Sequence, residues 1–123
     1  MTYHVDRLRA AVTVLVGDGH IKQRLVRAYQ NHIEAIRDDE LPAELRTEFE
    51  ALRAAMHRVA PLNGEGPVRA SVRKMSVEDA SDCAISVLTM YGAAMRLAGD
   101  RQDSLPLDDQ TDNVPAFLVK SAS

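Results

Sequence analysis

Apolar residues recur every three or four positions through residues 76–98, the longest uninterrupted helical pattern in the chain. Ser76 followed by Asp79 predicts the helix start, because a serine hydroxyl accepts a backbone N–H there. Gly99 predicts its end. The stripe expected to face the core is Val77, Ala84, Leu88, Tyr91 and Met95, with Ala80, Val87 and Ala98 at its margins. The side expected to face water holds Glu78, Asp82, Ser86, Thr89, Ala93 and Arg96.

Three shorter amphipathic patterns precede this helix, at residues 4–16, 20–38 and 42–59. Turn-forming residues separate them at 17–19 and 61–67. The second pattern places Ile21, Leu25, Ala28, Tyr29, His32 and Ile36 on one face, with Val26 and Ile33 at its margin. The third spaces Leu45, Phe49, Leu52, Met56 and Val59 by four and three residues, which is typical of helices packed at a shallow angle.

Residues 68–75 have an ambiguous pattern. Val68, Ala70 and Val72 alternate with polar residues as in an edge strand, whereas Val68, Val72 and Met75 fit one helical face. Residues 11–16 are also rich in β-branched side chains, so a strand competes with a helix there. No convincing partner strand is present, so an extended arm or a short helix is expected for residues 68–75.

These patterns predict an all-α protein, a small three- to four-helix bundle over residues 1–99, followed by a disordered acidic tail over residues 100–123. A chain of 123 residues is the size of one domain. The net charge of −3 resides in the tail, where five aspartates face two basic residues, so the bundle is neutral overall. Bulk charge therefore gives no argument for nucleic-acid binding. The sequence leaves open whether the tail docks on the bundle.

Residue chemistry points away from an enzyme. The single cysteine, Cys83, excludes an internal disulfide and fits a reducing compartment. No spacing of histidine, cysteine or acidic residues predicts a metal site, and no glycine-rich loop predicts a nucleotide or other cofactor. We expect no signal peptide and no membrane-spanning segment, and therefore a cytoplasmic protein.

His32 is the one histidine placed in the middle of a predicted apolar stripe. A buried imidazole requires hydrogen-bond partners and can change charge near neutral pH. His32 is thus a candidate for a buried polar or pH-sensitive site, although a core histidine with satisfied hydrogen bonds is the simpler interpretation.

The best candidate for a binding surface is the group Arg69, Arg73, Lys74 and Ser76, beside the start of the long helix. Guanidinium groups together with exposed helix N–H groups attract carboxylate or phosphate. Glu78 and Asp79 oppose this interpretation, because they already neutralise the positive end of the helix.

The sequence thus favours a small regulatory or adaptor protein that binds another macromolecule, with an unidentified protein as its partner. Wide apolar stripes predict a homodimer. One alternative is a nucleic-acid-associated regulator that uses the basic residues Lys22, Arg24 and Arg27 of the second helix together with those of residues 68–75. Another is a ligand-binding or catalytic bundle centred on His32.

Overall fold

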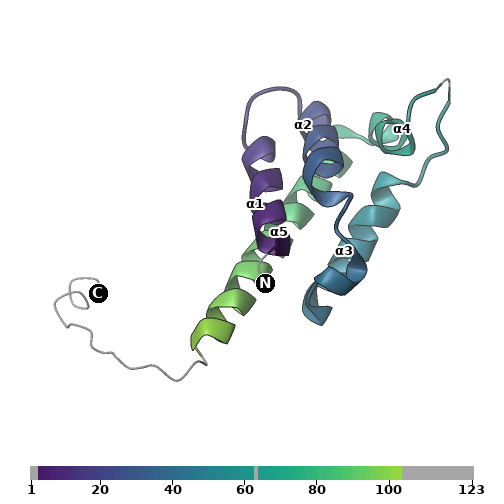
Figure 1. Cartoon of the computed structure of the whole chain (residues 1–123). Coiled ribbons are helices and arrows are strands. Elements are labelled where there is room, and N and C mark those ends of the chain that lie inside the picture. The colour runs from purple at the N-terminus through teal and green to yellow at the C-terminus, as the bar shows by residue number, and fades with distance from the viewer. Residues whose placement is uncertain (1–2, 63, 104–123) are drawn as a thin grey trace.

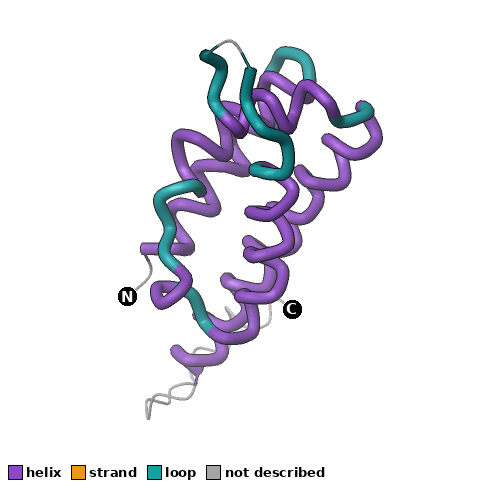
Figure 2. Tube along the Cα trace, turned by 90° about the vertical axis from the view of Figure 1, so that its right-hand side faces the viewer, coloured by secondary structure: helices purple, strands orange, loops and turns teal. Residues whose placement is uncertain are grey.

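The computed structural model describes residues 3–62 and 64–103, which form five α-helices. They are α1 (Tyr3–Leu15), α2 (Ile21–Ala28), α3 (Ala43–Met56), α4 (Pro67–Lys74) and α5 (Val77–Asp103). A π-helical turn (Tyr29–Ile33) extends α2, and a 3₁₀ turn (Asp38–Glu40) precedes α3. The described residues contain no strand, so the prediction of an all-α protein is confirmed for them (Figure 2).

Residues 68–75 prove to be helical up to Lys74, which settles the ambiguity of that segment and adds the fifth helix. Pro67 occupies the first turn of α4, where its fixed φ and missing N–H are tolerated. Val68 and Val72 are buried against the rest of the molecule, and so is Ser71, whose Oγ accepts a hydrogen bond from the Val59 N–H at 2.9 Å. Packing of this face favours the helix over an extended arm.

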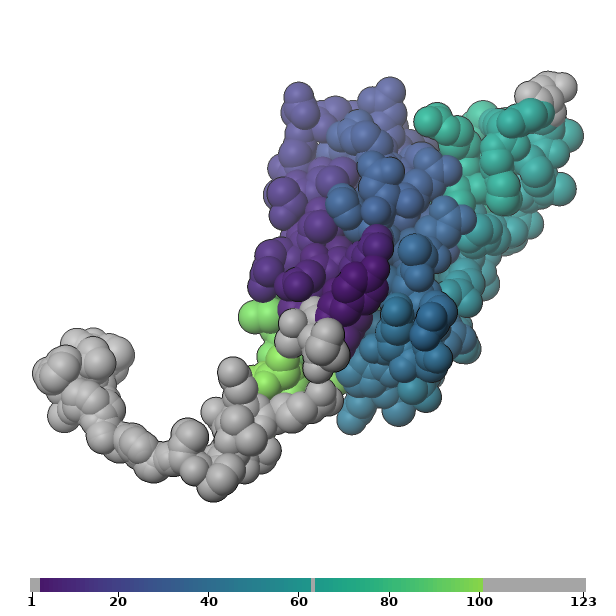
Figure 3. Space-filling view, viewed as in Figure 1, coloured from purple at the N-terminus to yellow at the C-terminus, as the bar shows by residue number. Residues whose placement is uncertain are grey.

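The core is mainly aliphatic, with Tyr29 and Phe49 as its largest buried side chains, and it lies between α1, α2, α3 and α5, with Val68 and Val72 of α4 at one end. α1 packs against both α2 and α5, α3 packs against α5, and α4 lies beside α2 and α3 (Figure 1). The four-three spacing of the third pattern is confirmed over its first four members, because Leu45, Phe49, Leu52 and Met56 are all buried. Figure 3 shows the surfaces of α1 and α2 side by side, and the teal surface around α4 at the upper right of the molecule.

The predicted phase of the long helix is displaced. Ala80 and Val87, predicted at the margin of the stripe, face the core together with Met90 and Ala94, whereas Val77, Leu88 and Met95 of the predicted stripe are about half exposed. Both faces of α5 have apolar residues at helical spacing, so periodicity alone could not decide which one packs against α1 and α3.

The predicted end of that helix is also wrong, because α5 continues through Gly99 to Asp103. A glycine ends a helix only when the chain adopts the left-handed conformation there, and Gly99 does not. The proposed boundary between residues 99 and 100 therefore falls inside α5. The remainder of the predicted tail, residues 104–123, lies outside the described residues.

Candidate functional site: a cationic groove between two helices

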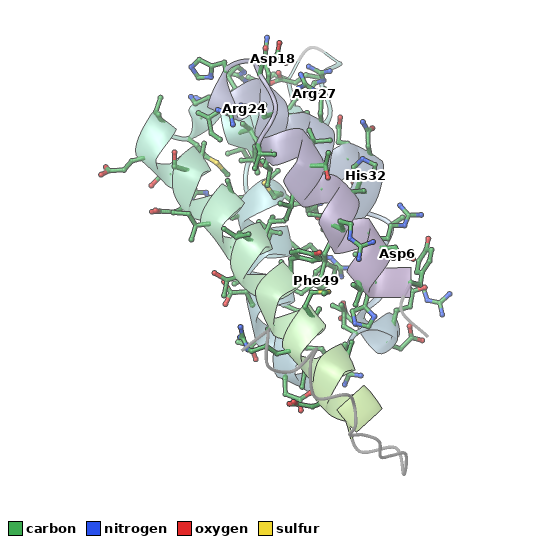
Figure 4. All side chains as sticks on the ribbon, turned by 90° about the vertical axis from the view of Figure 1, so that its left-hand side faces the viewer. Asp6, Asp18, Arg24, Arg27, His32 and Phe49 are labelled. Carbon is green, nitrogen blue, oxygen red and sulfur yellow. The ribbon has the colours of Figure 1, made fainter. Side chains whose placement is uncertain are left out.

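A groove of about 440 Å³ lies between α2 and α4. Four cationic side chains and one carboxylate line it, giving the lining a net charge of +3, and two valines supply its apolar part. The lining residues are Lys22, Gln23, Val26 and Arg27 of α2, Glu65 of the preceding loop, and Arg69, Val72 and Arg73 of α4. We call this the α2–α4 groove. Figure 4 shows Arg27 near the end of the bundle that also holds Asp18 and Arg24.

Helical spacing explains why these side chains meet. Arg69, Val72 and Arg73 are three and four residues apart and so share one side of α4. On α2, Val26 follows Lys22 by four residues and is adjacent to Arg27, so these residues also share one side of their helix. Because α2 and α4 pack against each other, the two basic faces border one groove.

Two of the four cations already have partners that fix the groove's shape. The Arg73 guanidinium donates to both carboxylate oxygens of Glu65, with Nε 3.3 Å from Oε1. This hydrogen bond and the charge of Arg73 lower the pKa of Glu65, and the charges of Arg69 and Lys74 act in the same direction. Lys22 Nζ donates to the Arg73 carbonyl oxygen at 3.2 Å, which joins α2 to the last turn of α4. A cation at a helix C-terminus is favourable.

The other two cations are available to a ligand. Arg27 and Arg69 are exposed, and neither forms a hydrogen bond or ion pair with another of the described residues. A guanidinium group binds a carboxylate or phosphate through two parallel hydrogen bonds. The groove therefore offers two unpaired guanidinium groups above two valines that are nearly buried.

The structure divides the predicted group of binding residues. Arg69 and Arg73 line the groove, whereas Lys74 is exposed and is not among the lining residues. Ser76 caps α5 as predicted, with Oγ accepting the Asp79 N–H at 2.9 Å, so that hydroxyl already has a structural role. Lys22 and Arg27 were expected from sequence only in the nucleic-acid alternative, and Glu65 was missed because it lies in a loop without periodicity.

His32 does not occupy the buried position that its spacing predicted. Its side chain is half-buried, whereas Ile33 is fully buried. The cause is the π-helical turn, in which the Glu34 N–H donates to the Tyr29 carbonyl oxygen five residues back, at 2.8 Å. This turn contains one residue more than an α-helical turn, so the position that faces the core moves from residue 32 to residue 33.

A polar cluster that sequence reasoning missed lies beside this π-helical turn. The buried Tyr29 hydroxyl is 3.1 Å from Nε2 of His57, and the same nitrogen is 3.8 Å from a carboxylate oxygen of Glu34. Burial, reinforced by the charge of Glu34, raises the pKa of Tyr29. Arg53 and Glu50 border the same open hollow, so opposite charges largely offset each other there and no class of ligand is selected.

Other chemistry is sparse in the part of the chain that the structure describes. Burial raises the pKa of the half-buried Cys83 thiol, and the charges of Asp79 and Asp82 add to that effect, which disfavours the thiolate form. No group of three or more histidine, cysteine or acidic side chains within the described ranges could hold a metal ion. Among the described helices, none is both long enough and apolar enough to cross a bilayer.

Comparison of the chain with models of protein families, with curated proteins and with solved structures gave no significant match.

Proposed function

We propose that this protein is a small regulatory or adaptor protein that binds an acidic segment of a partner protein in the α2–α4 groove. One observation carries the proposal: two unpaired guanidinium groups, on Arg27 and Arg69, border one groove. Carboxylates of the partner would pair with the guanidinium groups, and the chain between them would pass over Val26 and Val72, which are nearly buried and add little apolar contact.

The composition of the groove favours a peptide over a nucleic acid. No aromatic residue is among the lining residues, so nothing there can stack on a base. The carboxylate of Glu65 repels a phosphate backbone, and its lowered pKa keeps it charged. A volume of about 440 Å³ accommodates a few side chains and not a duplex.

The test is a fluorescence-anisotropy titration at physiological ionic strength with labelled twelve-residue probes. One peptide alternates glutamate with leucine, a second has lysine in place of glutamate, and single-stranded and duplex DNA of the same length complete the set. We expect the acidic peptide to bind and the basic peptide not to bind.

Arg69→Glu is the test variant and Lys74→Glu its matched control. Both replace an exposed cation of α4 by a carboxylate, but only Arg69 lines the groove. Loss of a charge-assisted hydrogen bond costs about 1.5–3 kcal/mol, so Arg69→Glu should weaken the affinity roughly 10- to 150-fold. Lys74→Glu should weaken the affinity clearly less, because Lys74 does not line the groove and acts on it only through the charge that it also exerts on Glu65.

Glu65→Gln should raise the affinity for the acidic peptide, since it removes the one carboxylate among the described lining residues. Equal losses in Arg69→Glu and Lys74→Glu would contradict the proposal. DNA binding that exceeds peptide binding and falls steeply with salt would favour the nucleic-acid alternative instead.

A further inference from the structure

We infer that two copies of this chain associate through the outer face of α5, in an antiparallel arrangement whose two-fold axis crosses the outer face level with position 90. No described residue of α5 lines the α2–α4 groove, so the inference is independent of the proposed function.

The outer face of α5 has a second apolar seam in addition to the one that faces the core. Ile85, Leu88 and Met95 are 58%, 54% and 42% exposed, which is far more than a monomer needs on one helix. Three small residues on the same face complete a series in which the spacing alternates between four and three residues, as at a helix–helix interface. We call this series the seam: Ser81, Ile85, Leu88, Gly92, Met95 and Gly99. Of the six, Ile85, Leu88 and Met95 are exposed, and the described part of the chain leaves the three small residues only partly buried. The seam is about 27 Å long at 1.5 Å per residue.

The seam matches itself when one copy is reversed. With the axis level with position 90, Leu88 lies opposite Gly92 of the second copy, Ile85 opposite Met95, and Ser81 opposite Gly99. Each glycine thus faces a larger residue, which lets two helices approach closely. Gly92 has no Cβ, and the nearest atom to a Cβ built there belongs to the flexible end of Arg96, so the position is open on its outer side.

Charge selects the antiparallel orientation. Asp82 and Arg96 flank the seam on the same side, are exposed, and form no ion pair with any described residue. In the antiparallel register Asp82 faces Arg96 of the second copy, and the two-fold axis produces this pair twice. A parallel pairing would bring Arg96 opposite Tyr91 and leave Asp82 without a cationic partner.

The neighbouring groove gives the second copy a place to pack. It has a volume of about 260 Å³ and is lined mainly by apolar side chains of α1 and α5, among them Val12, Leu15 and Ile85. Val16, at the end of α1, is 76% exposed beside it. Figure 4 shows α1 and α5 side by side on this face. Met95 of the second copy, opposite Ile85, is long and flexible enough to enter the groove.

The experiment is sedimentation velocity and equilibrium on the full chain, with circular dichroism as a check of the fold. The wild-type protein should sediment at twice the 13.5 kDa chain mass. Leu88→Glu should sediment as a monomer with an unchanged helical spectrum. A wild-type protein that stays monomeric at about 100 µM overturns the inference.

Charge reversal tests the register. Asp82→Arg places arginine opposite Arg96 twice, and Arg96→Asp places aspartate opposite Asp82 twice, so each variant alone should raise the dimer Kd at least tenfold, about 1.4 kcal/mol. An equimolar mixture of the two variants should restore wild-type affinity within about threefold, because each chain then presents only one sign of charge to the other. The double variant Asp82→Arg/Arg96→Asp should dimerise by itself.

Asp18→Arg, an exposed charge reversal in the α1–α2 loop, is the matched control and should leave the Kd unchanged. A dimer that resists Leu88→Glu, or single charge variants that do not recover on mixing, would place the interface or the register elsewhere and contradict the inference.

Discussion

The π-helical turn after α2 makes a quantitative prediction about two adjacent residues, His32 and Ile33. Regular helical spacing assigns His32 to the core, but the structure leaves Ile33 with no exposed surface and His32 half-buried. Alanine at position 33 removes three buried carbon groups, worth about 2.4 kcal/mol at roughly 0.8 kcal/mol each. The cavity left behind adds to this, so we expect Ile33→Ala to lower the free energy of unfolding by about 3–4 kcal/mol.

His32→Ala should change the free energy of unfolding by no more than about 0.5 kcal/mol, as expected for a position outside the core. The assay is urea denaturation followed by circular dichroism at 222 nm, with the midpoint and the slope fitted separately. The slope should be the same in both variants, because neither alters the surface exposed on unfolding by much. If His32→Ala lowered the free energy of unfolding by 2 kcal/mol or more and Ile33→Ala lowered it only slightly, the π-helical turn would be refuted and a regular α-helix would be indicated there.

Three further predictions concern the cap of α5, the ion pair of the groove and the cysteine. Ser76→Ala should lower the free energy of unfolding by about 1 kcal/mol in the same urea assay, because it leaves the Asp79 N–H without its acceptor. The pKa of Glu65 is lowered in the folded state, so its ion pair with Arg73 stabilises the fold above the ordinary glutamate pKa and is lost as the pH falls through the lowered one. Glu65→Gln should therefore flatten the acid side of a stability-against-pH curve, and an unchanged curve would contradict the ion pair. Cys83 should react with iodoacetamide at least about tenfold more slowly in the folded protein than in urea, since burial raises its pKa; equal rates would show that the thiol is accessible and ionised.

The sequence alone determined the features that depend on local chemistry. Ser76 and the acidic residues after it specify the start of α5, and the four-three spacing of Leu45, Phe49, Leu52 and Met56 specifies both α3 and its buried face. Hydrogen bonding and side-chain periodicity within a few residues are sufficient for these predictions.

Tertiary structure decided the features that depend on which surfaces meet. α5 has two apolar faces, and only its packing against α1 and α3 selects Val87 and Met90 for the core and leaves Leu88 outside. The π-helical turn inserts one residue into the helical phase, a change that no pattern of apolar residues records in advance. The α2–α4 groove likewise joins Arg27 to Arg69 across more than forty residues of chain, because packing of two helices, and not spacing within either one, brings their basic faces together.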